Sequence, residues 1–162
     1  MYLSVIEKAV STVDSTAKYK PGSRYVDEKG NEYIYALGVA DTAIGSWVAF
    51  SLETTNNTPV TAILTYTLAT ATACSLGVAM GAIIADKYGW YQIAGAAEGL
   101  ACASDAADAL QYTSGTDGSL DDGATIGGPI TMIKIMGVRL VDTDAGSGGL
   151  CTFHIKHPRT KS

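Results

Sequence analysis

Charged residues are scarce in this 162-residue chain, and basic residues are the scarcer kind. Lys and Arg together number 11 against 16 acidic residues, so the formal net charge is −5. A surface that binds nucleic acid is normally basic, so we expect no nucleic-acid partner. Hydrophobic residues make up 47% of the chain, which argues against disorder. A folded protein with so few charges has much uncharged surface, which suits a subunit that contacts neighbouring proteins.

Cysteine is also rare, and its positions form no recognisable pattern. Cys74, Cys102 and Cys151 are odd in number and widely spaced, so neither a disulfide framework nor a CxxC motif is predicted. We expect small buried thiols in a protein that is synthesised in a reducing compartment. The N-terminus lacks the basic stretch and the cleavage site of a signal peptide.

The motifs that carry catalysis are missing. The chain has no GxSxG, no GxGxxG after a strand and no Walker-type loop, so no catalytic residue and no cofactor is predicted, and we expect no enzymatic activity. His154 and His157 give an HxxH spacing, but on a strand these side chains point to opposite faces. Asp142 and Asp144 precede a glycine-rich loop that lacks the further ligands of an EF-hand. We therefore expect no metal site.

Charge is absent altogether from Thr54 to Ala85, and within this stretch Val60 to Ala85 is long enough to cross a bilayer. The stretch is nevertheless rich in threonine, contains Pro59 and lies between the acidic residues Glu53 and Asp86. Residues 64–68 alternate apolar and polar side chains, which is typical of a strand with one buried face. We therefore expect soluble strands here and no membrane partner.

Short strand-like runs separated by turn residues dominate the rest of the sequence. A Gly-containing loop joins two of these runs near the N-terminus, a second joins two in the middle, and a third joins the last two, so three hairpins are predicted. In the last run Phe153 and Ile155 alternate with His154 and Lys156, which predicts one buried and one exposed face. The runs are 24–26, 32–37, 47–50, 77–85, 90–93, 130–141 and 150–156.

This pattern predicts one all-β domain over residues 23–162, a compact sandwich or barrel of short antiparallel strands with at most one or two short helices. The best helix candidate is Ala101–Gln111, where Ser104 or Asp105 could cap an alanine-rich turn.

Three aromatic residues on predicted strands allow two interpretations. Trp47, Trp90 and Tyr91 could form a platform that stacks against a sugar, which would make the protein a carbohydrate-binding or receptor-adhesion module. Aromatic side chains on strands are more often part of the core, because they bury a large area.

Four blocks, in this order, resemble the small capsid decoration (cement) proteins of tailed bacteriophages. The resemblance implies a β-rich protein, often a homotrimer, that binds the outer surface of the assembled head over the major capsid protein and stabilises it. It implies no catalytic residues and a place on the virion after synthesis in the host cytoplasm. A related possibility is the base domain of a phage head fibre. The blocks are PGSRYVDEKGNEYIYALGVADTAIGSWVAF (21–50), LGVAMGAIIADKYGWYQIAGAAEGLA (76–101), TDGSLDDG (116–123) and GLCTFHIKHP (149–158).

The leader, residues 1–22, resembles this family least, and two interpretations stay open for it. It could be an arm that orders on the capsid, because it carries apolar anchors that would offset the lost conformational entropy. It could instead add a first strand to its own domain. The candidate capsid-contact residues of such an arm are Tyr2, Leu3, Val5, Ile6 and Val10.

Overall fold

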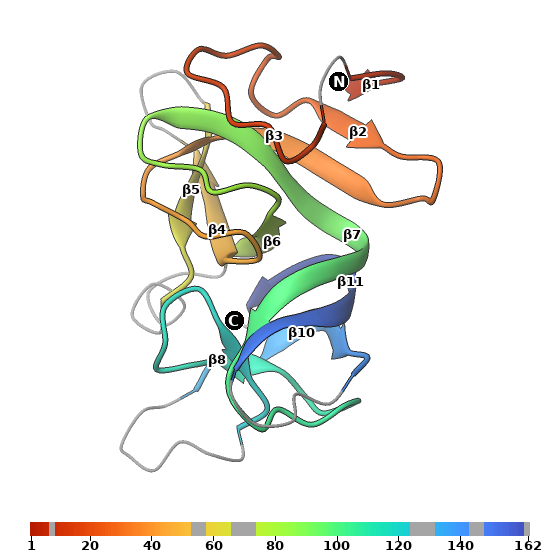
Figure 1. Ribbon diagram of the computed structural model, residues 1–162, viewed down its shortest axis with the longest axis vertical. Helices are drawn as coiled ribbons and strands as arrows, with labels where there is room; N and C mark the ends of the chain where they lie inside the picture. Colours follow the sequence, from red (N-terminus) through yellow and green to blue (C-terminus); the bar gives the residue numbers. More distant parts are fainter. Residues whose placement is uncertain (7–8, 53–57, 66–73, 124–131, 143–147, 161–162) are drawn as a thin grey trace.

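The computed structural model describes residues 1–6, 9–52, 58–65, 74–123, 132–142 and 148–160, and these residues form eleven strands and no helix (Figure 1). The prediction of an all-β fold is therefore confirmed. In chain order the strands are β1 (Tyr2–Leu3), β2 (Arg24–Val26), β3 (Glu32–Gly38), β4 (Trp47–Leu52), β5 (Pro59–Ile63), β6 (Ser75–Ala79), β7 (Lys87–Ala101), β8 (Tyr112–Thr113), β9 (Leu120–Asp121), β10 (Ile135–Leu140) and β11 (Gly149–Thr160).

Five of the strands pair in a closed ring, which matches the barrel alternative of the prediction. The ring runs from β3 to β5, β4, β6 and β7, and β7 pairs with β3 again. The three predicted hairpins are present as the antiparallel pairs β2–β3, β6–β7 and β10–β11. The prediction of only antiparallel strands is wrong, because β1–β2, β3–β5 and β7–β9 are parallel.

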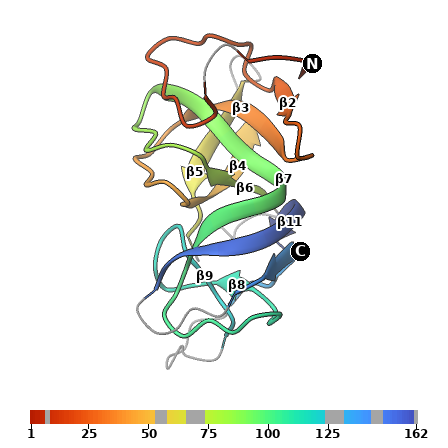
Figure 2. The ribbon, with the colours of Figure 1, turned by 45° about the vertical axis from the view of Figure 1, so that its right-hand side comes forward.

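Strand β7 links the ring of strands to the β10–β11 hairpin and, contrary to the prediction of short strands, is long. It spans 15 residues; its first half pairs with β3, and its second half pairs with β11 (Figure 2). The strand bends at Gly95, which has a φ of 101°. A Cβ there would collide with Asn31, and the positive φ is strained for any residue with a side chain, so glycine is required. Buried Gln92 braces the bend by donating from Nε2 to the carbonyl oxygens of Ala94 (3.1 Å) and Ala96 (2.8 Å).

Strand β11 pairs with the second half of β7 and with β10, and it has the predicted alternation of buried and exposed side chains. Phe153 and Ile155 are buried, whereas His154 and Lys156 are exposed. Trp47 from β4 meets Phe153 from β11 edge to face, with ring centroids 5.2 Å apart, so the main core extends from the ring of strands to β11.

The predicted helix over Ala101–Gln111 is wrong. Ala101 ends β7, and turns follow it. Ser104 and Asp108 have φ values of 66° and 62°, in the left-handed region that a right-handed helix cannot include. The backbone bonds to other elements instead, since the amide of Asp108 donates to the Leu140 carbonyl at 3.0 Å. Tertiary contacts override the local helix propensity of the alanines here.

Two further predictions concern the cysteines, expected as buried thiols without disulfides, and the uncharged stretch, expected to form strands. None of the three cysteines forms a disulfide; Cys74 is buried, whereas Cys102 and Cys151 are half-buried. Within the described part of the chain, no helix is long and apolar enough to span a membrane. Residues 66–68 of the predicted alternating strand lie outside the described residues, as do 130–131 of the predicted run before the last hairpin.

Candidate functional site

The leader lies along its own domain. Tyr2 and Leu3 form β1, which pairs in parallel with Arg24 and Tyr25 of β2 at the edge of the sheet. Farther along, Asp14 pairs with Tyr88 of β7 through two backbone hydrogen bonds of 2.8 and 2.9 Å. The hydroxyl of Tyr35 donates to Asp14 Oδ2 at 2.8 Å, and both residues are buried.

The five candidate contact residues of the leader divide into two groups. Leu3, Ile6 and Val10 pack against the aromatic cluster Tyr33–Tyr35–Trp90 of this same domain. Tyr2 and Val5 are 64% and 75% exposed. Together with Met1, which is 71% exposed, they place apolar side chains in solvent at the β1 edge. We call Met1, Tyr2 and Val5 the leader face.

A group of charged side chains holds the leader to the start of β3. Glu32 accepts hydrogen bonds from Arg24 Nη1 at 2.7 Å and from the Tyr2 hydroxyl at 3.0 Å. His157 Nε2 of β11 lies 3.4 Å from the second carboxylate oxygen of Glu32. Burial by itself would raise the pKa of Glu32, but the hydrogen bonds from Arg24 and Tyr2 outweigh it, so the pKa lies below its ordinary value.

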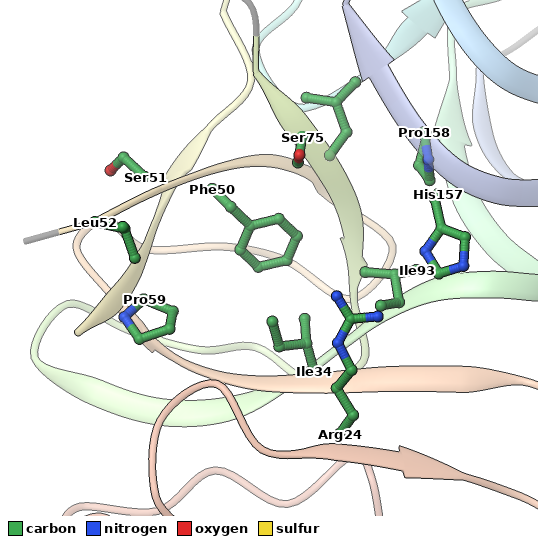
Figure 3. A pocket seen from close by; sticks show the side chains of 11 residues that line it. Arg24, Ile34, Phe50, Ser51, Leu52, Pro59, Ser75, Ile93, His157 and Pro158 are labelled. Carbon is green, nitrogen blue, oxygen red and sulfur yellow. The ribbon is translucent and has the colours of Figure 1, made fainter. Parts of the chain in front are cut away.

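A groove of about 410 Å³ opens beside this charged group (Figure 3). Arg24 and His157 lie at one end of the groove, Leu52 and Pro59 at the other, and Phe50 between them. His157 has a φ of 46° and stands where β11 passes from β7 to β6. The whole lining consists of Arg24, Ile34, Phe50, Ser51, Leu52, Pro59, Ser75, Leu76, Ile93, His157 and Pro158.

The chemistry of the groove suits an apolar side chain more than a reaction. Its floor is aliphatic and aromatic, and its polar groups are the hydroxyls of Ser51 and Ser75, the imidazole of His157 and the cation of Arg24. The Arg24 cation is already paired with Glu32, so little uncompensated charge faces the groove. An arrangement of this kind can accept an apolar residue of another protein, with hydrogen bonds at the rim.

Replacing Glu32 tests the charged group. Glu32→Gln is expected to lower the free energy of unfolding by about 1–3 kcal/mol at neutral pH, because it removes the charge from two hydrogen bonds. A carboxylate with a lowered pKa stabilises the fold above its ordinary pKa and loses this effect as the pH falls through the folded value, so the difference should shrink in acid. Denaturant titrations at several pH values measure the difference in the free energy of unfolding between this variant and the unsubstituted protein. Glu28→Gln, in the exposed loop, is the matched control; equal curves for both variants would contradict the assignment.

The three aromatic residues considered for a sugar platform are core residues. Trp47 and Tyr91 are fully buried and Trp90 is 2% exposed. The Tyr91 hydroxyl accepts a hydrogen bond from Thr61 Oγ1 at 2.9 Å inside the ring of strands. The carbohydrate-binding hypothesis built on these residues is therefore wrong, and the core interpretation is confirmed.

The other polar candidates do not combine into a ligand set. His154 and His157 are both exposed, and His157 contacts Glu32 rather than His154. Asp142 is described, whereas Asp144 and the rest of 143–147 lie outside the described residues. Among the residues that the structure describes, no three His, Cys, Asp or Glu side chains are placed to hold a metal ion.

Two groups of residues were missed by the sequence analysis. In the Arg24–Glu32–His157 group, Arg24 and Glu32 belong to the predicted hairpin of 24–26 and 32–37, but His157 comes from β11, which is distant in sequence. The buried pair of Asp105 and Gln111 lies in the segment that was expected to be helical.

Comparisons with known proteins found similarity to a solved structure. No protein-family model matches the sequence, and no curated protein matches it either. The chain is similar to the N base of head fiber gp8.5 in bacteriophage phi29, with a TM-score of 0.47 and 14% sequence identity over 80% of this chain and 98% of that chain. Similarity at this level assigns neither a family nor a function.

Proposed function

We propose that the protein is a structural component of a bacteriophage head, a decoration protein that binds the outer surface of the assembled shell and stabilises it. The observation that carries the proposal is the ordered resemblance of the four blocks 21–50, 76–101, 116–123 and 149–158 to decoration proteins. All four blocks contribute strands to one sheet, where β7 pairs directly with β3, β9 and β11. The resemblance thus falls on the part of the chain that builds the fold.

The leader face is the surface that we assign to the major capsid protein. Its side chains Met1, Tyr2 and Val5 are exposed and apolar, while the neighbouring Leu3 and Ile6 hold the segment against the domain. A contact residue that is already positioned costs less entropy to bind than a residue on a disordered arm. We therefore propose a docked strand with outward side chains in place of an arm that orders only on the shell.

We further propose that the protein assembles as a homotrimer and has no enzymatic activity. The low charge of the chain favours contacts between subunits, and closed symmetry is the usual result of such contacts. The number three comes from the resemblance to decoration proteins. Light scattering should give a mass three times 16.8 kDa; a monomer both in solution and on heads would contradict the trimer.

Binding to heads tests the proposed function. Heads assembled from the major capsid protein of the same genome are mixed with the purified protein and sedimented. The protein is expected to co-sediment with intact heads to a saturating ratio and to stay in solution without them. Heads should also withstand heating better when it is bound, since a ligand of the assembled state stabilises that state. Failure to co-sediment at micromolar concentration would contradict the proposal.

A further inference from the structure

Two buried oxygen atoms in the segment between β7 and β8 lack a hydrogen-bond partner among the described residues. They are Oδ2 of Asp105 and Oε1 of Gln111, and each residue is only 1% exposed. A buried acceptor that is left unpaired costs the full desolvation of that group, so each such atom needs an explanation.

The same two side chains already share one hydrogen bond through their other atoms. Gln111 Nε2 donates to Asp105 Oδ1 at 3.2 Å. A carboxylic acid and a primary amide can form two hydrogen bonds side by side, N–H to C=O and O–H to C=O, which close a ring. The missing half of that ring needs one proton on Oδ2 of Asp105, which would donate to Oε1 of Gln111. In such a ring a single proton would satisfy both buried oxygens.

We propose that, in mildly acidic solution, Asp105 is a protonated carboxylic acid in the folded protein, paired with Gln111 in a two-bond ring that fastens the β7–β8 connection, and that loss of this proton as the pH rises loosens the connection.

The surroundings of Asp105 favour the neutral acid. Burial is the largest cause that raises its pKa, and the nearby carboxylates of Asp122 and Asp121 add to the rise. The hydrogen bond of Gln111 and the backbone amide of Ala106 oppose it, and the pKa reaches about 6 from an ordinary value of 3.8. Asp121 ends β9, and Asp122 follows it.

A bound cation would be the other way to satisfy the two oxygens, and the geometry argues against it. Asp121 Oδ1 accepts from the Gly123 amide at 2.8 Å, and Asp122 Oδ2 accepts from the Ala106 amide at 3.0 Å. Each carboxylate thus serves a backbone donor of its own. In the part of the chain that is described, no three such side chains converge as metal ligands. A proton needs only the pair itself.

The pair lies where the β7–β8 connection is tied to its neighbours. The Gln111 carbonyl accepts from the Ile135 amide of β10 at 2.8 Å, and the Cys102 amide donates to the Leu120 carbonyl of β9 at 2.8 Å. Ionised Asp105 would place a charge beside Asp121 and Asp122 in this buried region. Because the folded pKa is raised, its contribution to stability is complete below the ordinary pKa and is lost as the pH rises through the folded value.

Asp105→Asn tests the proposal, because an amide at this position can form the same two-bond ring permanently. The unfolding equilibrium constant of the unsubstituted protein, divided by that of D105N, should rise about a hundredfold between about pH 3.5 and 7.5, as a pKa of 3.8 unfolded and about 6 folded requires. Asp108→Asn is the matched control, since Asp108 lies in the same connection but is exposed and pairs with Arg139 at 3.2 Å. The same ratio of unfolding equilibrium constants, taken with D108N, should not rise with pH in this way.

A second measurement keeps the proposal testable if D105N does not fold. Carbon-13 NMR of the Asp105 carboxyl in the unsubstituted protein should give an apparent pKa of about 6. A carboxyl that titrates at or below its ordinary value of 3.8, or a pH-independent ratio for D105N, would overturn the acid–amide pair.

Discussion

Removal of residues 1–20 should lower the free energy of unfolding by at least about 3–5 kcal/mol, the cost of losing several buried apolar side chains. The deletion removes Tyr19, whose ring centroid lies 5.3 Å from that of Tyr35 and 5.4 Å from that of Trp90. It also removes Asp14, which accepts the hydrogen bond of the buried Tyr35 hydroxyl. The aromatic cluster beneath the leader would then be exposed to water.

Denaturant titration of the truncated protein measures this loss. Tyr19→Ala serves as a partial version and should cost about 2–4 kcal/mol, because it removes a large side chain from the same cluster but leaves the Asp14 hydrogen bond. A truncated protein with the stability of the full chain would show that the leader adds nothing to the fold. Since we expect damage to the fold, the deletion cannot decide what the leader binds, and a surface substitution is needed.

Val5→Asp should weaken binding to heads at least tenfold and leave the free energy of unfolding unchanged within about 0.5 kcal/mol. Val5 is 75% exposed, so the free protein tolerates a charge there, whereas a contact with the shell would bury that charge without a partner. Co-sedimentation with heads at increasing protein concentration gives the affinity, and thermal or denaturant unfolding gives the stability.

The matched control for Val5→Asp is Leu110→Asp. Leu110 is 55% exposed and belongs to the connection between β7 and β8, which lies at the opposite end of the long axis from β1 (Figure 1). This variant should bind heads like the unsubstituted protein. Equal affinities for both variants would remove the leader face from the contact, and a loss with Leu110→Asp alone would move the contact to the other end.

The parts of the fold that the sequence predicted are those set by neighbouring residues. Hairpin β2–β3 follows from a loop in which Asp27 Oδ1 accepts hydrogen bonds from the amides of Lys29 and Asn31, both at 2.9 Å. The alternation in β11 follows from the period of a strand that covers a core. Such signals are local, so composition and spacing reveal them.

The parts that were missed depend on contacts between distant segments. Strand β5 follows β4 in the chain but lies between β3 and β4 in the sheet, where it pairs in parallel with β3. No local pattern in the sequence encodes this order. The segment 101–111 has the alanines of a helix, yet its amides bond to β9 and β10. A short segment gains little from helix propensity, so tertiary hydrogen bonds decide its conformation.

The candidate site was predicted in part for the same reason. The apolar residues of the leader could be recognised from the sequence, but their division into inward Leu3, Ile6 and Val10 and outward Tyr2 and Val5 depends on where Trp90 and Tyr35 lie. The groove beside Arg24 and His157 arises because β11 crosses from β7 to β6, a step that the hairpin signal of β10–β11 does not contain.

The most direct test of the proposed function is electron cryomicroscopy of heads assembled with and without this protein. We predict added density on the outer surface of the shell, into which the ring of strands fits with the β1 edge and its leader face turned toward the capsid protein. Heads that carry no added density at saturating protein concentration, or that carry it only on the inner surface, would contradict the assignment as a decoration protein.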